Sequence, residues 1–495
     1  MLNKNISKIL IGILFSLLSA ILLIISLPPG KYWYCIFIAL VPSILAQYRI
    51  MPKKFSSLAP AIYNAVWLGV FFIDIFASSG TYMIYLPIIL VLVVFLTEKN
   101  NVEFHEKTDY KYFVVKESLA WTAVEMIRLF IPIMGSWAFI AYALYRQNGL
   151  ILPVSIFGIL GLGLLIISIN FTLGLLAIKI YDYCNRKKEI SEIRRSWSVV
   201  KYSLIIVGFV LIGWGLLSIV LSQTREQKRT EVKVAAVSIN RRTSDGGYDD
   251  TPEIQENILN TLIDLTEKAV ANGARIVVWP EGALAFDPQV QDTEMLTDLA
   301  SKNNIYLTTG YIVANEDGTW RNEAVTITPD GKFSGRYGKQ HPVLFGGEKN
   351  TGLGNYPVID TPYGKLGVII CYDQDFTDST RFAVSNGAQI LAVPSLDWPE
   401  IADRHYAHTV FRALENKVSI IKADGGYDSV IINEYGEILE KNISKIPVTK
   451  VVISKISIPQ SGTFYTRFGD FIGWIGIASI LIFIFIERKV LAKKK

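Results

Sequence analysis

Eight apolar stretches constrain the fold of this chain more than any other feature of its sequence. A helix needs about 20 apolar residues to cross the hydrocarbon core of a bilayer. We expect spanning helices over residues 8–27, 33–48, 59–78, 81–97, 112–131, 151–181, 200–222 and 467–486. The fifth stretch contains charged residues, among them Glu125 and Arg128, which lie one helical turn apart. Charges are costly in hydrocarbon, so these two either pair with each other, the simpler alternative, or line a crevice for substrate.

The region between the seventh and eighth stretches has the charge density of a water-facing domain. Hydrophobic residues make up 51% of the chain and the mean hydropathy is +0.34, but the apolar residues gather near the two ends. A chain of 495 residues also exceeds what one hydrophobic core normally serves. We therefore predict a membrane domain of seven helices over 1–223, a polar domain over 224–460, and a last helix with a basic tail over 461–495.

The distribution of Lys and Arg predicts the orientation, because these residues favour cytoplasmic loops. Both termini and every even-numbered loop are basic, with Lys53 in the second loop and Arg195 in the sixth. The short odd-numbered loops carry only Lys31 and Arg146. Eight helices with both termini inside would place the polar domain outside the cytoplasm. This topology also explains the net charge of +5, so we expect no nucleic-acid partner.

The polar domain alternates strand-like runs with amphipathic helical stretches. The runs include VKVAAVSI, ARIVVWPE, IYLTTGYIV, KLGVIICYD, AQILAVPS and VSIIKADGG. Such apolar strands, separated by helices, indicate an α/β domain whose sheets are covered by helices. The domain has two halves of similar rhythm, which favours a layered sandwich over one open sheet.

Three residues at strand ends or in loops form a chemically complete set. Cys371 is the only cysteine of the polar domain, since Cys35 and Cys184 lie in or beside apolar stretches. Glu281 ends the run ARIVVWPE, and Lys339 follows a hairpin-like turn. A carboxylate can take the thiol proton, a cation can hold developing negative charge, and a thiolate can attack a carbonyl. Each residue alone has an ordinary explanation as a solvated acid, a surface lysine or a buried thiol.

Four segments, VVWPEG, YGKQH, VIICYDQ and RALEN, resemble signature stretches of the nitrilase (carbon-nitrogen hydrolase) superfamily. The resemblance implies an α-β-β-α sandwich in which Glu281 is the general base, Lys339 the oxyanion stabiliser and Cys371 the nucleophile. A nitrilase-like domain between a seventh and an eighth membrane helix is similar to the apolipoprotein N-acyltransferase family. The segments LPPGKYW, LPVSIFGILGLGLLIISIN and GTFYTRFGD extend that similarity along the chain.

This second resemblance implies a bacterial enzyme that works by a ping-pong reaction. Cys371 would take an acyl chain from a phospholipid as a thioester, and the amine of a diacylglyceryl-cysteine lipoprotein would accept it. The implied location is the bacterial cytoplasmic membrane, with a multi-pass anchor, an extracytoplasmic catalytic domain, no cofactor and no metal. The alternatives are a membrane-anchored amidase, an acyltransferase with another amine acceptor and, least favoured, a non-catalytic sensor.

The chain departs from the family pattern in loops expected to touch substrate. The segment HPVLFGGE has one extra glycine, so the second active-site carboxylate is either Glu348 or is replaced there by Gly347. Asp373 stands where a Glu commonly follows the Cys–Tyr pair. We expect Tyr372 and Trp398 near the substrate as well, although core packing explains Trp398 equally well.

Two histidines at helical spacing, His405 and His408, suggest a metal site at first sight. The sequence offers no convincing third ligand, and a surface position or a supporting role beside the active site is the favoured interpretation.

Overall fold

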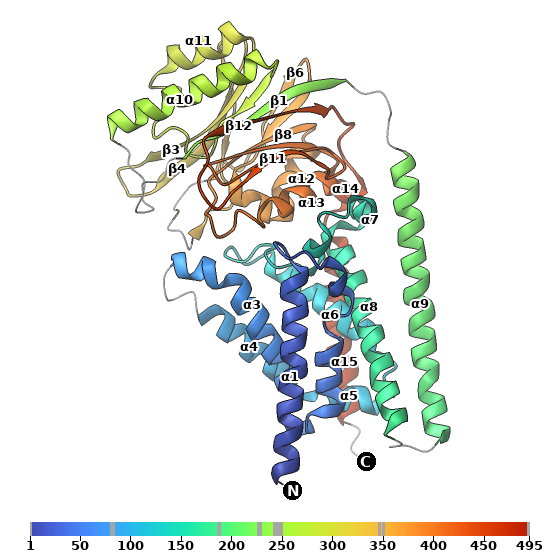
Figure 1. The fold of residues 1–495 in the computed structure, drawn as a ribbon. Coiled ribbons are helices and arrows are strands. Elements are labelled where there is room, and N and C mark those ends of the chain that lie inside the picture. Colours follow the sequence, from blue (N-terminus) through green and yellow to red (C-terminus); the bar gives the residue numbers. More distant parts are fainter. Residues whose placement is uncertain are drawn as a thin grey trace.

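The computed structural model describes residues 2–79, 85–185, 190–224, 230–240, 251–344, 348 and 352–492. A bundle of helices carries an α/β domain at one end (Figure 1). Helix α1 (Leu2–Ser26) begins, and helix α15 (Phe471–Ala492) ends, at the opposite end of the bundle. The two ends of the described chain therefore lie on the same side, far from the α/β domain.

Six helical segments of the described residues are long and apolar enough to cross a membrane. They are Asn5–Ser26, Trp33–Ile50, Lys53–Ile73, Val154–Cys184, Trp197–Gln223 and Phe471–Ala492. They coincide with the first, second, third, sixth, seventh and eighth predicted stretches. The fourth and fifth stretches correspond to shorter helices, α4 (Tyr85–Thr97) with 13 residues and α6 (Phe113–Arg128) with 16.

The bundle contains helices of different kinds besides α1, α4, α6 and α15. The others are η1 (Trp33–Phe37), α2 (Val41–Leu45), η2 (Ala46–Ile50), η3 (Lys53–Phe55), α3 (Leu58–Ser79), η5 (Glu98–Asn100), α5 (Asn101–Lys107), η6 (Ile140–Leu144), α7 (Asn148–Ile151), α8 (Val154–Cys184) and α9 (Ile190–Gln223). Helix α9 stands at the side of the bundle (Figure 1). Only 6% of its most apolar 18-residue stretch is buried within the protein. A helix so apolar and so little buried within the protein presents its surface to lipid.

Two six-stranded sheets form the centre of the α/β domain. The first has the strand order β12-β1-β2-β3-β4-β5 and the second β11-β10-β9-β8-β7-β6. The strands are β1 (Glu231–Ser238), β2 (Ile276–Val278), β3 (Tyr306–Ala314), β4 (Trp320–Ile327), β5 (Phe333–Gly338), β6 (Val358–Thr361), β7 (Gly364–Val368), β8 (Ile390–Ser395), β9 (Ser419–Asp424), β10 (Asp428–Ile432), β11 (Ile438–Ile443) and β12 (Lys450–Ser457). Strands β1, β2 and β3 are parallel, as are β7, β8 and β9.

Helices cover the outer face of each sheet. Helices α10 (Pro252–Ala271) and α11 (Thr293–Asn303) lie on the first sheet, and α12 (Thr377–Ser385) and α13 (Tyr406–Asn416) on the second, between it and the bundle (Figure 1). A short helix, α14 (Phe464–Phe468), joins the domain to α15. This arrangement confirms the predicted fold class, a helical membrane domain with an α-β-β-α sandwich.

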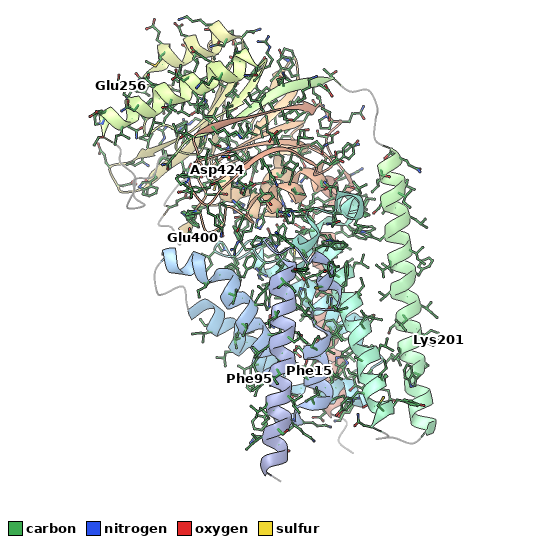
Figure 2. All side chains as sticks on the ribbon, in the orientation of Figure 1. Phe15, Phe95, Lys201, Glu256, Glu400 and Asp424 are labelled. Carbon is green, nitrogen blue, oxygen red and sulfur yellow. The ribbon has the colours of Figure 1, made fainter. Side chains whose placement is uncertain are left out.

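One apolar core runs from the bundle into the sandwich. It includes Ala20 of α1, Trp137 between α6 and η6, Phe411 of α13 and Ile420 of β9. Figure 2 places Asp424 inside the sandwich and Glu400 near its junction with the bundle. Because the packing is continuous, side chains of the bundle lie close behind the second sheet.

Candidate active site

The three predicted catalytic residues come from both sheets and lie together between them. Glu281 follows β2 and Lys339 follows β5 in the first sheet, and Cys371 follows β7 in the second and opens the short helix η8 (Cys371–Asp375). The Lys339 Nζ is 2.8 Å from Glu281 Oε1. The Cys371 thiol interacts electrostatically with both charges. All three side chains are buried.

The backbone at Cys371 adopts a left-handed conformation, with φ +44°. Such a conformation costs a residue other than glycine about 1–2 kcal/mol, so its surroundings must hold it in place. The Asp373 carboxylate does so at one side of the turn. It accepts hydrogen bonds from Ile370 N at 3.0 Å, Gln340 N at 3.1 Å, His341 N at 2.8 Å and the Tyr337 hydroxyl at 2.7 Å. Asp373 thus joins the cysteine turn to the strand that leads to Lys339.

The lysine amine lies between two carboxylates. Glu348 Oε1 is 2.8 Å from Lys339 Nζ, and its Oε2 accepts a hydrogen bond from Val343 N at 2.8 Å. The extra glycine of this loop therefore does not keep Glu348 from the site; Gly347 itself lies outside the described residues. Glu281 Oε1 also accepts a hydrogen bond from Asn322 Nδ2 at 2.6 Å.

Burial and neighbouring charges shift the pKa values of Glu281, Lys339 and Cys371. It raises the pKa of Glu281, and the Glu348 charge raises it further against the opposing effect of Lys339. Burial lowers the pKa of Lys339, but the two carboxylates outweigh it and hold that pKa well above its usual value. Burial also raises the pKa of the Cys371 thiol well above its usual range, and the Glu281 and Asp397 carboxylates add to the effect while Lys339 opposes it. The resting nucleophile is therefore a thiol, and a carboxylate of raised pKa is a suitable base for it.

Another carboxylate, that of Asp397, contacts the nucleophile. It follows β8, and its Oδ1 lies 3.7 Å from Cys371 Sγ, within reach of a thiol donor. Its Oδ2 accepts from His405 Nδ1 and Lys422 Nζ, both at 2.7 Å. The sequence patterns did not single out Lys422. The signal was present, since Lys422 is a single cation near the end of the strand-like run VSIIKADGG.

The two histidines are buried rather than exposed, which corrects the surface interpretation. His405 Nε2 is 3.0 Å from Asp375 Oδ1, and His408 Nδ1 forms a short contact with the same oxygen. These three ligand atoms lie close enough to share an ion, so Asp375 is the third group that the sequence did not reveal. The Asp375 oxygen already hydrogen-bonds to both histidine nitrogens, and the other nitrogen of His405 is bonded to Asp397. We therefore interpret Asp375, His405 and His408 as a hydrogen-bonded cluster rather than as a metal site.

Tyr372 and Trp398 occupy different surroundings. Tyr372 is buried, and its hydroxyl donates to Pro132 O at 3.2 Å, in the segment that follows α6. Trp398 is half-buried and packs against the main apolar core. Contact of either residue with substrate remains a prediction.

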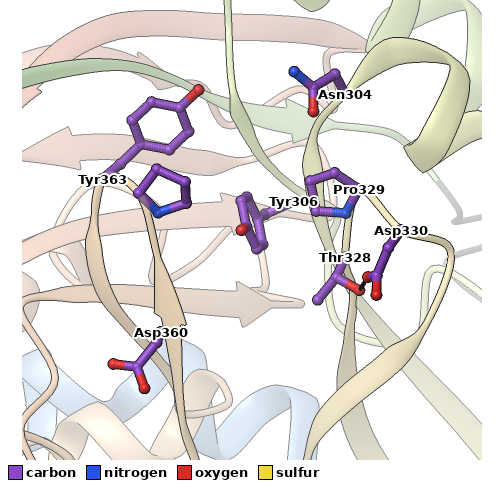
Figure 3. A pocket seen from close by; sticks show the side chains of 8 residues that line it. Asn304, Tyr306, Thr328, Pro329, Asp330, Asp360 and Tyr363 are labelled. Atoms are coloured by element: carbon purple, nitrogen blue, oxygen red, sulfur yellow. Dashed lines mark hydrogen bonds between the residues drawn. The ribbon is translucent and has the colours of Figure 1, made fainter.

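An open pocket of about 440 Å³ lies at another edge of the sandwich (Figure 3). The turn after β4 and the strands β3 and β6 supply most of its lining, including Tyr306, Asp330 and Tyr363. None of the predicted site residues is among its lining residues, so we do not connect it with the chemistry.

Comparisons with known proteins cover both regions of the chain. The carbon-nitrogen hydrolase family model matches residues 233–460, and the model of the apolipoprotein N-acyltransferase N-terminal domain matches residues 19–172. The apolipoprotein N-acyltransferase of Geobacter metallireducens is 24% identical over 518 residues, covering 95% of this chain and 94% of its own length. That of Thermotoga maritima is 24% identical over 520 residues, covering 97% and 94%. The crystal structure of Saccharomyces cerevisiae Nit3, a member of branch 10 of the nitrilase superfamily, covers 46% of this chain and 90% of its own, with 19% identity and a TM-score of 0.39.

Proposed function

Because the chain belongs to the apolipoprotein N-acyltransferase family, we propose that it transfers an acyl chain from a phospholipid to the N-terminal amine of a diacylglyceryl-cysteine lipoprotein. One observation carries the proposal beyond the family name. Glu281, Lys339 and Cys371 lie together in a buried site whose cysteine turn contacts the membrane bundle through Tyr372. A catalytic group built against membrane helices suits substrates that reside in a bilayer.

The first half of the proposed reaction forms a thioester. Glu281 takes the thiol proton while Cys371 Sγ attacks the ester carbonyl carbon of the phospholipid. Lys339 stabilises the negative charge that develops on the carbonyl oxygen. The bond between the carbonyl carbon and the glycerol oxygen then breaks, and Glu281 returns its proton to that oxygen, which releases a lysophospholipid.

The second half uses the same groups in reverse. The lipoprotein amine attacks the thioester carbonyl, Glu281 accepts a proton from the amine, and Lys339 again stabilises the oxyanion. The carbon–sulfur bond breaks, the new amide leaves with the lipoprotein, and the Cys371 thiolate regains its proton from Glu281. A positioned base of this kind contributes about 10²- to 10⁴-fold in rate.

We also propose the location and the domain limits that the sequence predicts. The catalytic domain, 224–460, would face the extracytoplasmic side of the bacterial cytoplasmic membrane, between the helical region 1–223 and the last helix with its tail, 461–495. The basic even-numbered loops support this orientation. The position of both described chain ends at the far end of the bundle agrees with it (Figure 1).

Lipoproteins from cells that lack the protein provide the test. Mass spectrometry of their N-terminal peptides should show a free amine, and the wild-type chain should restore the N-acyl group. Cys371→Ala should fail to restore it, whereas Cys184→Ala, at an exposed free cysteine, should restore it fully. N-acylation that persists without the protein would reject the proposal. Release of free fatty acid by the purified protein, without transfer to a lipopeptide, would instead favour a hydrolase, in which the acyl group passes to water.

A further inference from the structure

The nucleophile turn is attached to the membrane bundle at its far end, through Asp375. The Asp375 carbonyl oxygen accepts hydrogen bonds from Ser136 N at 2.8 Å and Ser136 Oγ at 2.7 Å. Its carboxylate Oδ2 accepts from the Trp137 indole Nε1 at 2.9 Å. Ser136 and Trp137 belong to the segment between α6 and η6, more than 230 residues earlier in the chain. The last residue of η8 is thereby bonded directly to the bundle.

The segment that holds Asp375 is itself held firmly. Glu125 Oε1 accepts a hydrogen bond from Ile140 N at 3.1 Å, and the Arg128 guanidinium donates to the Trp137 carbonyl oxygen. Each of these two charges of α6 therefore bonds to the 137–140 backbone rather than forming an ion pair with the other. Gly135, with φ +47°, allows the close approach, because a Cβ there would lie 2.9 Å from the Asp375 carbonyl oxygen.

The second carboxylate oxygen of Asp375, Oδ1, is connected to the nucleophile by a series of contacts. Asp375 Oδ1 contacts His405 Nε2 at 3.0 Å, His405 Nδ1 contacts Asp397 Oδ2 at 2.7 Å, and Asp397 Oδ1 accepts from Cys371 Sγ at 3.7 Å. The backbone of η8 completes the circuit from Asp375 to Cys371. The Trp137 ring also stacks on His405, with centroids 5.2 Å apart and planes at 23°. The orientation of the thiol and the position of the bundle segment are thus linked by hydrogen bonds.

From this closed circuit we propose that Asp375 is a positioning residue through which the membrane-domain segment 135–140 sets the orientation, and hence the reactivity, of the Cys371 thiol. The membrane domain then contributes to the active site itself. His405 Nε2 and His408 Nδ1 both contact Asp375 Oδ1. Lys422 Nζ lies 2.7 Å from Asp397 Oδ2 and 2.7 Å from Asp428 Oδ2, so both carboxylates of the circuit have partners. The proposal rests on the proposed function only where acyl transfer is measured.

Trp137→Phe in the full-length protein is the sharpest test, because it removes the Nε1 donor to Asp375 and keeps an aromatic ring at the position. Two quantities are measured per folded molecule: the rate of Cys371 alkylation by iodoacetamide, read by peptide mass spectrometry, and kcat and KM for phospholipid-to-lipopeptide transfer. We expect alkylation and kcat to fall together by about tenfold, the effect of one hydrogen bond to a charged group, with KM unchanged. In Asp375→Asn the alkylation rate and kcat should fall by more, because this variant also loses the charge that faces His405.

Matched controls separate positioning from general damage. Trp474→Phe, on the lipid-exposed face of α15, and Asp360→Asn, at an exposed strand position, should change neither quantity. If Trp137→Phe fails to fold, Ser136→Ala removes one donor to the Asp375 carbonyl oxygen and leaves the backbone donor in place. It should lower both rates in the same direction, by less.

Some results of these measurements would overturn the positioning role, and others would support it. Unchanged alkylation in Trp137→Phe and Asp375→Asn, or a raised KM with unchanged alkylation, would overturn the proposal, the latter because it would make Trp137 a lipid-binding residue. Reduced alkylation in the variants, together with a wild-type protein that transfers no acyl chain, would support the positioning role and reject the proposed function.

Discussion

Two clusters of buried charged residues flank Cys371, and they differ in how readily their members exchange protons. The front cluster consists of Glu281, Lys339 and Glu348, and the rear cluster of Asp375, Asp397, His405 and Lys422. In the front cluster a single amine lies between two carboxylates, and burial pushes the pKa of Glu281 up toward the range where it can exchange a proton. In the rear cluster, burial disfavours the charge on His405, but Asp397 and Asp375 outweigh it and raise the pKa to about 10.

The difference indicates a division of labour. Groups whose pKa values lie far from neutrality keep their charges at about pH 7 and do not exchange protons readily. The rear cluster therefore acts as a fixed charged frame, whereas the front cluster is suited to proton transfer. Substitutions in the two clusters should therefore affect chemistry and stability to different extents.

Glu281→Gln should break the front cluster with little change in shape. The amide cannot accept the thiol proton, so we expect kcat/KM for acyl transfer to fall about 10²- to 10⁴-fold. Transfer to a lipopeptide, followed by mass spectrometry, measures the loss. The control is Glu253→Gln, at an exposed position in the first turn of α10, which should retain full activity. A Glu281→Gln enzyme of near-normal rate would remove this residue from the proton path.

His405→Gln should break the rear cluster and change the stability more than the chemistry. Removing one partner of a buried ion pair costs about 3–5 kcal/mol, and without His405 the Asp375 carboxylate loses its cationic partner. The pKa of His405 is higher in the folded state than the ordinary value of about 6.5. Its stabilising effect is therefore complete below about pH 6.5 and disappears as the pH rises through about 10.

Thermal unfolding in detergent from about pH 6 to about pH 10 checks this prediction. The melting temperature of the wild-type protein should fall toward alkaline pH more steeply than that of the His405→Gln variant. Parallel curves for the two proteins would show that His405 is not held as a cation.

Gly135→Ala should weaken the attachment of the nucleophile turn to the bundle. The alanine would have to adopt φ +47° and bring its Cβ to 2.9 Å from the Asp375 carbonyl oxygen. A loss of about 1–3 kcal/mol is expected for such strain. Gly149→Ala is the control, since a Cβ there meets no atom within 4 Å. Equal melting temperatures for the two variants would argue against a tight contact at Gly135.

Asp397→Asn should produce the smallest effect on the reaction, a shift in the titration of the nucleophile. Burial is the main cause of the raised pKa of Cys371 and the Asp397 charge adds to it, so removing that charge should lower the pKa. The alkylation rate of Cys371 as a function of pH should therefore move to lower pH. A shift to higher pH would mean that Asp397 stabilises the thiolate, contrary to the charge arrangement described here.

Much of the fold follows from the sequence, because buried strands and spanning helices leave strong apolar patterns. The strand ends at Glu281 and Cys371 were recognisable from the β-branched runs that precede them, and the layered sandwich followed from the two halves of similar rhythm. The membrane bundle was harder to predict. Apolar content alone does not distinguish a full span from a short helix such as α6, which carries buried Glu117, Glu125 and Arg128.

The front cluster was predictable and the rear cluster was not, for a physical reason. Glu281 and Lys339 of the front cluster each stand at a strand end, as does Cys371, and the local pattern reveals such positions. The contact of Asp375 with Trp137 depends on how the bundle packs against the second sheet, which no local pattern encodes. His405 and His408 drew attention by their spacing, but the surface alternative was wrong because α13 is buried between the sheet and the bundle.

The most direct test of the proposed chemistry is the intact mass of the purified protein after incubation with phospholipid alone. A thioester on Cys371 should add the mass of one acyl chain, and peptide mapping should place that mass on the segment that contains Cys371. Addition of a diacylglyceryl lipopeptide with a free amine should remove the added mass and transfer it to the peptide. No mass gain under these conditions, or an acyl chain on any residue other than Cys371, would contradict the assignment of Cys371 as the acyl carrier.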